Sequence, residues 1–296
     1  MRALILPLAL LATAAAPAPP KKLTPTDIID AAPASAWREI PAQDLMVMTL
    51  EGGGRVVIQL APRFAPVHSE NIRRMATGGY WRGAAVYRVQ DNYVAQWGIN
   101  EEKRDLPRGA VAKPPHEYWR SAKGLQVTPF PYRDSYAPRA GYVDGWPVAL
   151  ENDGTANLTH CYGYVGVARD LHPDTGTGGE LYAIIGHAPR ALDRNITVVG
   201  RVVAGIEQLS ALPRGTETMG FYKEGLVAKP ITAVTLASAM AGPDRPRFRY
   251  LATDSVAFRQ VLGLLGNRND DFFRVPAGGV DLCAARVPVR PVPAPK

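Results

Sequence analysis

The sequence predicts a mainly β fold that is rich in turns. Its 296 residues include 28 glycines and 27 prolines, which favour loops and turns over long helices. Two apolar runs of strand length, residues 45–50 and 55–60, flank three consecutive glycines at 52–54. Glycine supplies the positive φ that a tight hairpin turn needs. We therefore expect an antiparallel sheet that begins near residue 45.

The first 16 residues have the pattern of a signal peptide. Arg2 precedes an apolar run from Ala3 to Leu11, and small residues follow that suit a cleavage site. The run is shorter than the roughly 20 apolar residues of a membrane span. Pro7 argues against the alternative, an apolar helix of the fold. We expect export to the periplasm, or secretion, and a mature chain that is not inserted in the membrane.

The rest of the chain divides by composition into three parts. Residues 17–44 are rich in Ala and Pro and are expected to form a linker or an arm over the surface. Residues 45–240 are expected to form one domain, with an insertion at about 100–160 that shows no sustained period. Residues 241–296 are expected to be a C-terminal extension with one helix.

Short elements are expected inside these parts. A helix is predicted over residues 65–78, with Pro66 at its start and Gly78 at its end. In the extension, Asp254 is expected to cap a helix over 255–265. The other expected elements are strands over 80–89, 93–97, 163–169, 181–186, 196–202 and 231–240, and a helix over 204–212.

Charge and cysteine usage exclude some classes of function. The formal net charge is +7, but the basic residues are scattered, so nucleic-acid binding is not expected. The five histidines lack metal-ligand spacing, and neither a metal nor a cofactor is expected. Cys161 and Cys283 could pair in an oxidising compartment, or both could stay free; the sequence leaves this open.

One stretch carries a candidate site. Tyr87-Arg88-Val89, followed by residues 93–98, places a permanently charged guanidinium among apolar and aromatic residues. Burial of such a group is costly unless the guanidinium binds something. Arg88 is therefore a candidate functional residue.

This stretch resembles the segment of the cyclophilin family that carries the catalytic arginine, and further motifs recur in family order. They are Val57 to Leu60, Ala65-Pro66, Glu70 to Ile72, Gly79-Tyr80, Gln96, Gly98, Val167 to Arg169, Leu192-Asp193 and Val198 to Val202. The resemblance covers about residues 45–100 and 160–240. It implies a closed antiparallel eight-stranded β-barrel capped by two short helices, here with a C-terminal α extension. The implied activity is peptidyl-prolyl cis-trans isomerisation of proline-containing polypeptides, which assists protein folding.

The resemblance also implies roles for individual residues. Arg88 would be catalytic by donating toward the prolyl nitrogen, and Gln96 would be catalytic by orienting Arg88 or the substrate carbonyl. The implied substrate-binding residues are Tyr93, Val94, Ala168, Arg169, Glu180, Tyr182, Leu192 and Ile196.

Four positions depart from the usual family pattern. Ile196 stands where many members have His, and this change is expected to lower turnover. Ala191 stands where several members have Trp, and the loss of that Trp predicts low sensitivity to cyclosporin. Glu180 replaces Gln and could either pre-position or neutralise Arg88, and Trp97 replaces a glycine. These changes keep an alternative function open, a binding module or chaperone that holds unfolded exported chains with little isomerisation.

Overall fold

Eight antiparallel strands close into a barrel, which confirms the predicted fold class. The structure is a computed structural model that describes residues 22–99, 104–270 and 272–293. The barrel strands are β2 (Leu45–Leu50), β3 (Arg55–Leu60), β4 (Ala85–Val89), β5 (Val94–Gly98), β11 (Tyr164–Val167), β12 (Leu181–Ile184), β13 (Val198–Ala204) and β14 (Lys229–Leu236). Around the barrel they follow the order β11, β12, β5, β4, β14, β2, β3, β13, and β13 pairs with β11 to close it.

The first hairpin of the barrel, β2 to β3, forms where the glycines predict it. Gly52 and Gly53 both have φ 85°, and Met46 lies opposite Ile58 across the hairpin. Met46 and Ile58 point into the barrel and are fully buried in its core. Leu45, on the outer face, is also buried, in a second apolar cluster with Phe248. Both faces of β2 are covered, so its sequence does not alternate between apolar and polar residues.

Four α-helices are present among the described residues. They are α1 (Pro25–Ala31), α2 (Pro66–Thr77), α3 (Glu207–Ser210) and α4 (Val256–Gly266). Helix α2 agrees with the prediction, whereas α3 is shorter than predicted because Gly205, at φ 82°, interrupts the segment before it. The strand expected over 80–89 begins only at Ala85, since turns that include Gly83, at φ 80°, occupy its first half.

The insertion forms a sheet of its own, which the sequence analysis did not anticipate. Its strands are β6 (Arg120–Ser121), β7 (Thr128–Pro129), β8 (Arg139–Val143), β9 (Trp146–Leu150) and β10 (Thr155–Leu158), in the order β6, β10, β9, β8, β7. Side chains of this sheet, such as Trp146 and Val148, pack against Tyr182 and Val198 on the outside of the barrel. The insertion therefore covers one outer wall of the barrel.

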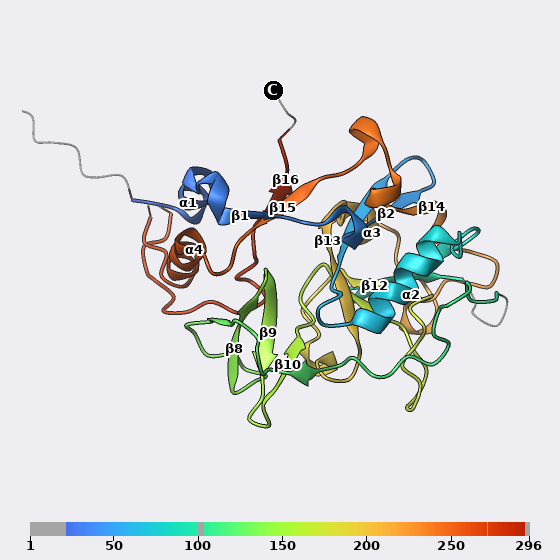
Figure 1. The fold of residues 1–296 in the computed structure, drawn as a ribbon, viewed down its shortest axis with the longest axis horizontal. Coiled ribbons are helices and arrows are strands. Elements are labelled where there is room, and N and C mark those ends of the chain that lie inside the picture. The colour runs from blue at the N-terminus through green and yellow to red at the C-terminus, as the bar shows by residue number, and fades with distance from the viewer. Residues whose placement is uncertain (1–21, 100–103, 271, 294–296) are drawn as a thin grey trace, which may run out of the picture.

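The segments before and after the barrel fold together. A third sheet joins β1 (Trp37–Glu39), β15 (Phe248–Leu251) and β16 (Val289–Pro291) in the order β1, β15, β16. Helices α1 and α4 are in contact beside it, and Figure 1 shows the blue and red ends of the chain lying together away from α2. The described part of 17–44 is therefore an ordered arm that pairs with the C-terminal extension, and not a linker.

The extension corrects one sequence prediction, the residue that caps α4, and answers one open question, whether the two cysteines pair. Ser255, and not Asp254, caps α4, because the Ser255 side chain accepts from the N–H of Phe258. Cys161 and Cys283 form a disulfide across 122 residues of sequence, which links the end of the insertion to the extension. Among the described residues no helix is long and apolar enough to cross a membrane. The expected signal peptide, residues 1–16, lies outside the described residues.

Candidate active site

Strands β4 and β5 place Arg88 and Gln96 next to each other. The two residues face each other across the strand pair, just after a register shift between Val86 and Arg88. Nη1 of Arg88 donates to Oε1 of Gln96 at 2.8 Å. Trp97, the next residue on β5, points the other way and is fully buried in the barrel core. The tryptophan therefore fills the barrel and leaves the outer surface to Arg88 and Gln96.

The guanidinium of Arg88 is held by three neutral acceptors. Besides Gln96, Nε donates to the backbone oxygen of Met219 at 2.8 Å and Nη2 donates to Oε1 of Gln90 at 2.5 Å. An arginine has five N–H donors, so two have no hydrogen-bond partner among the described residues. Burial lowers the pKa of Arg88 from its ordinary value, and the tyrosines Tyr93, Tyr87 and Tyr182 offset part of this change.

Aromatic rings surround the same guanidinium. Its Cζ lies 5.8 Å from the ring centre of Tyr93 and 5.4 Å from that of Phe221, within the range of cation–π attraction. The ring of Phe221 also stacks on Tyr87, with centres 6.1 Å apart. The rings limit the directions in which the Arg88 side chain can move.

Tyr87 connects Gln96 to Glu180. Nε2 of Gln96 donates to the Tyr87 hydroxyl, which in turn donates to Oε2 of Glu180. Burial, followed by the charge of Glu180, raises the pKa of the Tyr87 phenol well above its ordinary value, so the phenol keeps its proton. Through this chain of hydrogen bonds, Glu180 contributes to the position of Gln96 and hence of Arg88.

These residues line one cleft of about 540 Å³ on the outside of the barrel. Of the residues expected in the site, the cleft is lined by Arg88, Tyr93, Val94, Gln96, Ala168, Arg169, Glu180, Tyr182 and Ile196. Leu192 is the exception, because it packs under the cleft in the apolar cluster that contains Val94 and Tyr182. Sequence positions about 100 residues apart thus meet in one cleft.

Several residues of the cleft were missed from the sequence. Met219 and Phe221 reach it from the segment between α3 and β14, and Phe221 forms an isolated bridge with Arg88. Met219 has φ 61°, which a methionine rarely adopts and which its sequence does not signal. Tyr87 and Asp174 also line the cleft. Tyr87 stood beside Arg88 in the motif but was given no role.

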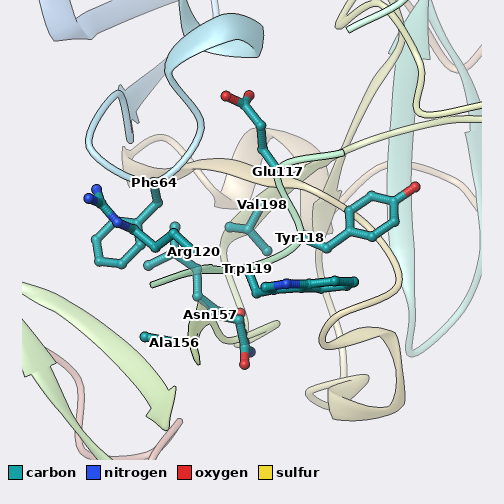
Figure 2. Close-up of a pocket in the computed structure, with 9 residues that line it drawn as sticks. Phe64, Glu117, Tyr118, Trp119, Arg120, Ala156, Asn157 and Val198 are labelled. Carbon is teal, nitrogen blue, oxygen red and sulfur yellow. Dashed lines mark hydrogen bonds between the residues drawn. The ribbon is translucent and has the colours of Figure 1, made fainter. Parts of the chain in front are cut away.

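The insertion reaches the edge of the cleft without lining it. Residues 117–120 lie beside Phe64 and Val198, and Figure 2 shows the side chain of Glu117 pointing away from those of Tyr118 and Trp119. Glu117 accepts from the backbone N–H groups of Val67 and His68 and from Nδ1 of His68. Burial acts to raise the pKa of Glu117, but these bonds outweigh it, so the pKa is lowered. No described residue of the insertion lines the cleft, so this part covers the barrel.

Comparison with known proteins identifies the family. A family model described as cyclophilin type peptidyl-prolyl cis-trans isomerase/CLD matches residues 45–239, about two thirds of the chain. The chain belongs to this family. Curated relatives of this cyclophilin-type isomerase include proteins of Brucella suis and Brucella abortus, each named "Probable peptidyl-prolyl cis-trans isomerase". Both are 23% identical to the chain over 188 residues, which is 64% of this chain and 79% of theirs.

A solved structure extends the similarity of fold beyond the barrel. The crystal structure of cyclophilin AquaCyp293 from Hirschia baltica superposes with a TM-score of 0.69 at 21% identity. The superposition covers 88% of this chain and 95% of that one. The family model ends at residue 239, whereas the superposition covers more of the chain than that model does. The cyclophilin-type isomerase therefore resembles AquaCyp293 in parts of the fold outside the barrel as well.

Proposed function

We propose that Arg88 is the catalytic residue of this isomerase, that Gln96 orients it, and that the substrates are X-Pro bonds of exported polypeptides. One observation carries the catalytic proposal. Within the described part of the chain, three donors of a half-buried guanidinium are bound to neutral acceptors, and two donors remain at a cleft that a peptide can enter.

The chemistry of the reaction requires such a donor. Rotation about an X-Pro bond crosses a barrier of about 18 to 20 kcal/mol, because the amide has partial double-bond character. In the twisted state the lone pair of the prolyl nitrogen is localised and accepts a hydrogen bond from Arg88. This bond is stronger in the transition state than in the planar ground state, so it accelerates rotation. No nucleophile or acid–base pair is needed.

Apolar residues of the cleft suit the proline ring. Val94, Tyr182 and Ile196 supply its walls, and Val94 and Tyr182 are held from below by the apolar cluster shared with the insertion. Ala168 lies at the rim, where its N–H already donates to the backbone oxygen of Glu180 at 2.9 Å. A bound peptide would therefore use other main-chain groups at this rim.

We place the enzyme in the periplasm, or outside the cell, on two observations. The first 16 residues have a signal-peptide pattern, and the disulfide between Cys161 and Cys283 is a bond typical of oxidising compartments. Fractionation of cells that express the full chain, with thiol alkylation before lysis, tests this. Recovery of the protein in the cytosol with two free thiols contradicts the proposal.

A protease-coupled assay on a proline-containing tetrapeptide tests the catalytic role. Arg88→Ala is expected to lower kcat/KM at least about 100-fold, the scale for loss of a transition-state hydrogen-bond donor. The matched control is Arg214→Ala, since Arg214 is an exposed arginine that pairs with Asp91 and does not line the cleft. Wild-type turnover no faster than the uncatalysed rate, together with peptide binding, would instead support a binding module or chaperone.

A further inference from the structure

A second cavity lies between the barrel and the C-terminal extension, beside the disulfide. Its volume is about 260 Å³. It is lined by Cys161, Tyr162, Gly163, Tyr164, Arg201, Val202, Val203, Ile206, Cys283, Arg286, Val287 and Val289. None of these residues lines the catalytic cleft.

Arg201 is the unusual residue of this cavity. Only 5% of its surface is exposed, and its Cζ lies 4.7 Å from the ring centre of Trp146. Nε donates to Oε1 of Gln59 at 2.9 Å and Nη1 donates to the backbone oxygen of Gly145 at 2.8 Å. Nη2 has no aligned hydrogen-bond partner among the described residues, and the ion pairs of those residues do not include Arg201. A buried guanidinium without an anion is costly for the fold.

A second cation and two phenols complete the polar part of the cavity. Arg286, from the extension, lies with its Cζ 4.9 Å from the ring centre of Tyr162. Burial raises the pKa of the Tyr164 phenol, and the charge of Arg201, a side-chain hydrogen bond from Arg201 to the phenol oxygen and the charge of Arg286 offset part of the rise. Tyr164 thus keeps its proton as a donor between two arginines. Every charged side chain that lines the cavity is a cation.

The remaining walls are apolar. Val203 and Ile206 come from the barrel side, Val287 and Val289 from the extension, and the disulfide closes one edge. An inorganic phosphate would be desolvated against these walls without contacts to replace the lost water. A carboxylate on a short hydrocarbon chain would contact both the polar and the apolar residues of the cavity. Its two oxygens lie in one plane and can accept two parallel N–H bonds from a guanidinium.

We propose that this cavity binds a small carboxylate with an apolar body. The carboxylate lies between Arg201, Tyr164 and Arg286, and the hydrocarbon lies along Val203 and Ile206. Because its walls come from both the barrel and the extension, the bound acid also holds the extension on the barrel. Binding to the folded state alone raises the midpoint of thermal unfolding.

Calorimetric titration of the full chain with hexanoate tests the proposal, with 1-hexanol and inorganic phosphate as comparison ligands. We expect one hexanoate per chain and at least about tenfold weaker binding of 1-hexanol, as for loss of one charge-assisted hydrogen bond. Arg286→Gln is expected to weaken the binding of hexanoate about tenfold. Arg259→Gln is the matched control, since this exposed arginine of the same extension lies outside the cavity.

A filling variant makes the site itself testable. Val203→Phe places a ring in the cavity and is expected to abolish hexanoate binding while the isomerase assay stays at the wild-type level, which also shows that the variant folds. Three results each overturn the proposal: no hexanoate binding by the wild type at millimolar concentration, equal binding of 1-hexanol, or unchanged hexanoate binding by Val203→Phe. The isomerase assay is independent of all three.

Discussion

Removal of one hydroxyl, by Tyr87→Phe, tests whether the chain of hydrogen bonds behind Arg88 supports catalysis. The hydroxyl accepts from Gln96 and donates to Glu180, and Gln96 accepts from Arg88. Phenylalanine keeps the ring that stacks on Phe221 but leaves Nε2 of Gln96 without this acceptor. Gln96 then holds Arg88 less firmly, while the donors of Arg88 itself are unchanged.

The size of the effect is limited by the bond that is lost. A neutral hydrogen bond contributes about 0.5 to 1.5 kcal/mol net, which corresponds to about 2- to 12-fold in rate. Because Tyr87 acts through Gln96, we expect kcat to fall by this factor, with KM little changed. The loss is much smaller than the factor of about 100 or more expected for Arg88→Ala, which removes the donor itself.

The protease-coupled assay measures this effect, and a double-mutant cycle identifies its route. Tyr87→Phe is expected to add nothing in a Gln96→Ala background, since the two residues act as one unit. Tyr222→Phe is the matched control, because the Tyr222 hydroxyl donates to the backbone of Pro213 outside the cleft. Full activity of Tyr87→Phe, or an equal loss in both backgrounds, would refute the reasoning.

Three further predictions concern stability and inhibition. The bond between Cys161 and Cys283 closes a loop of 122 residues, so its reduction is expected to lower the free energy of unfolding by about 5 kcal/mol in the chain-entropy model. Urea unfolding with and without reductant measures this loss, and a difference below about 1 kcal/mol contradicts the prediction. Burial raises the pKa of Tyr142 and of Tyr182 above the ordinary value of 10.0. The stability that these neutral phenols contribute is therefore present below pH 10 and is lost as the pH rises further. Unfolding midpoints that stay constant between pH 9 and 12 would argue against this loss of stability. Because position 191 is an alanine, cyclosporin is expected to inhibit the wild type weakly in the protease-coupled assay, and Ala191→Trp is expected to strengthen the inhibition. Tight inhibition of the wild type by cyclosporin would show that this position is not decisive.

The barrel could be predicted because its signals are local or recur in family order. The glycines at 52–53 and the motif around Arg88 each identify their elements without knowledge of the rest of the chain. A signal of equal strength in the insertion was overlooked. Asp144-Gly145, with φ 49° and 83°, forms the two-residue turn between β8 and β9, and this dipeptide is a strong hairpin indicator. The hairpin was therefore available from the sequence.

Other features had no such signal. Met219 contacts Arg88 through a backbone oxygen across 131 positions, and nothing in its own side chain predicts that bond. The pairing of the N-terminal arm with β15 joins Trp37 to Leu251, two segments that are each too short to show a period. Contacts of this kind depend on how the whole chain closes, which local patterns do not determine.

The substitution at Glu180 is understood together with Tyr87. By the family resemblance, position 180 usually carries the amide of a glutamine. An ionised carboxylate can only accept, and the Tyr87 hydroxyl supplies a donor to it while its oxygen still accepts from Gln96. Glu180 thus reaches Arg88 through two neutral side chains, and the three bonds that hold Arg88 go to neutral oxygens. This arrangement favours pre-positioning of the guanidinium over its neutralisation, because the carboxylate orients Gln96 and leaves donors of Arg88 for the prolyl nitrogen.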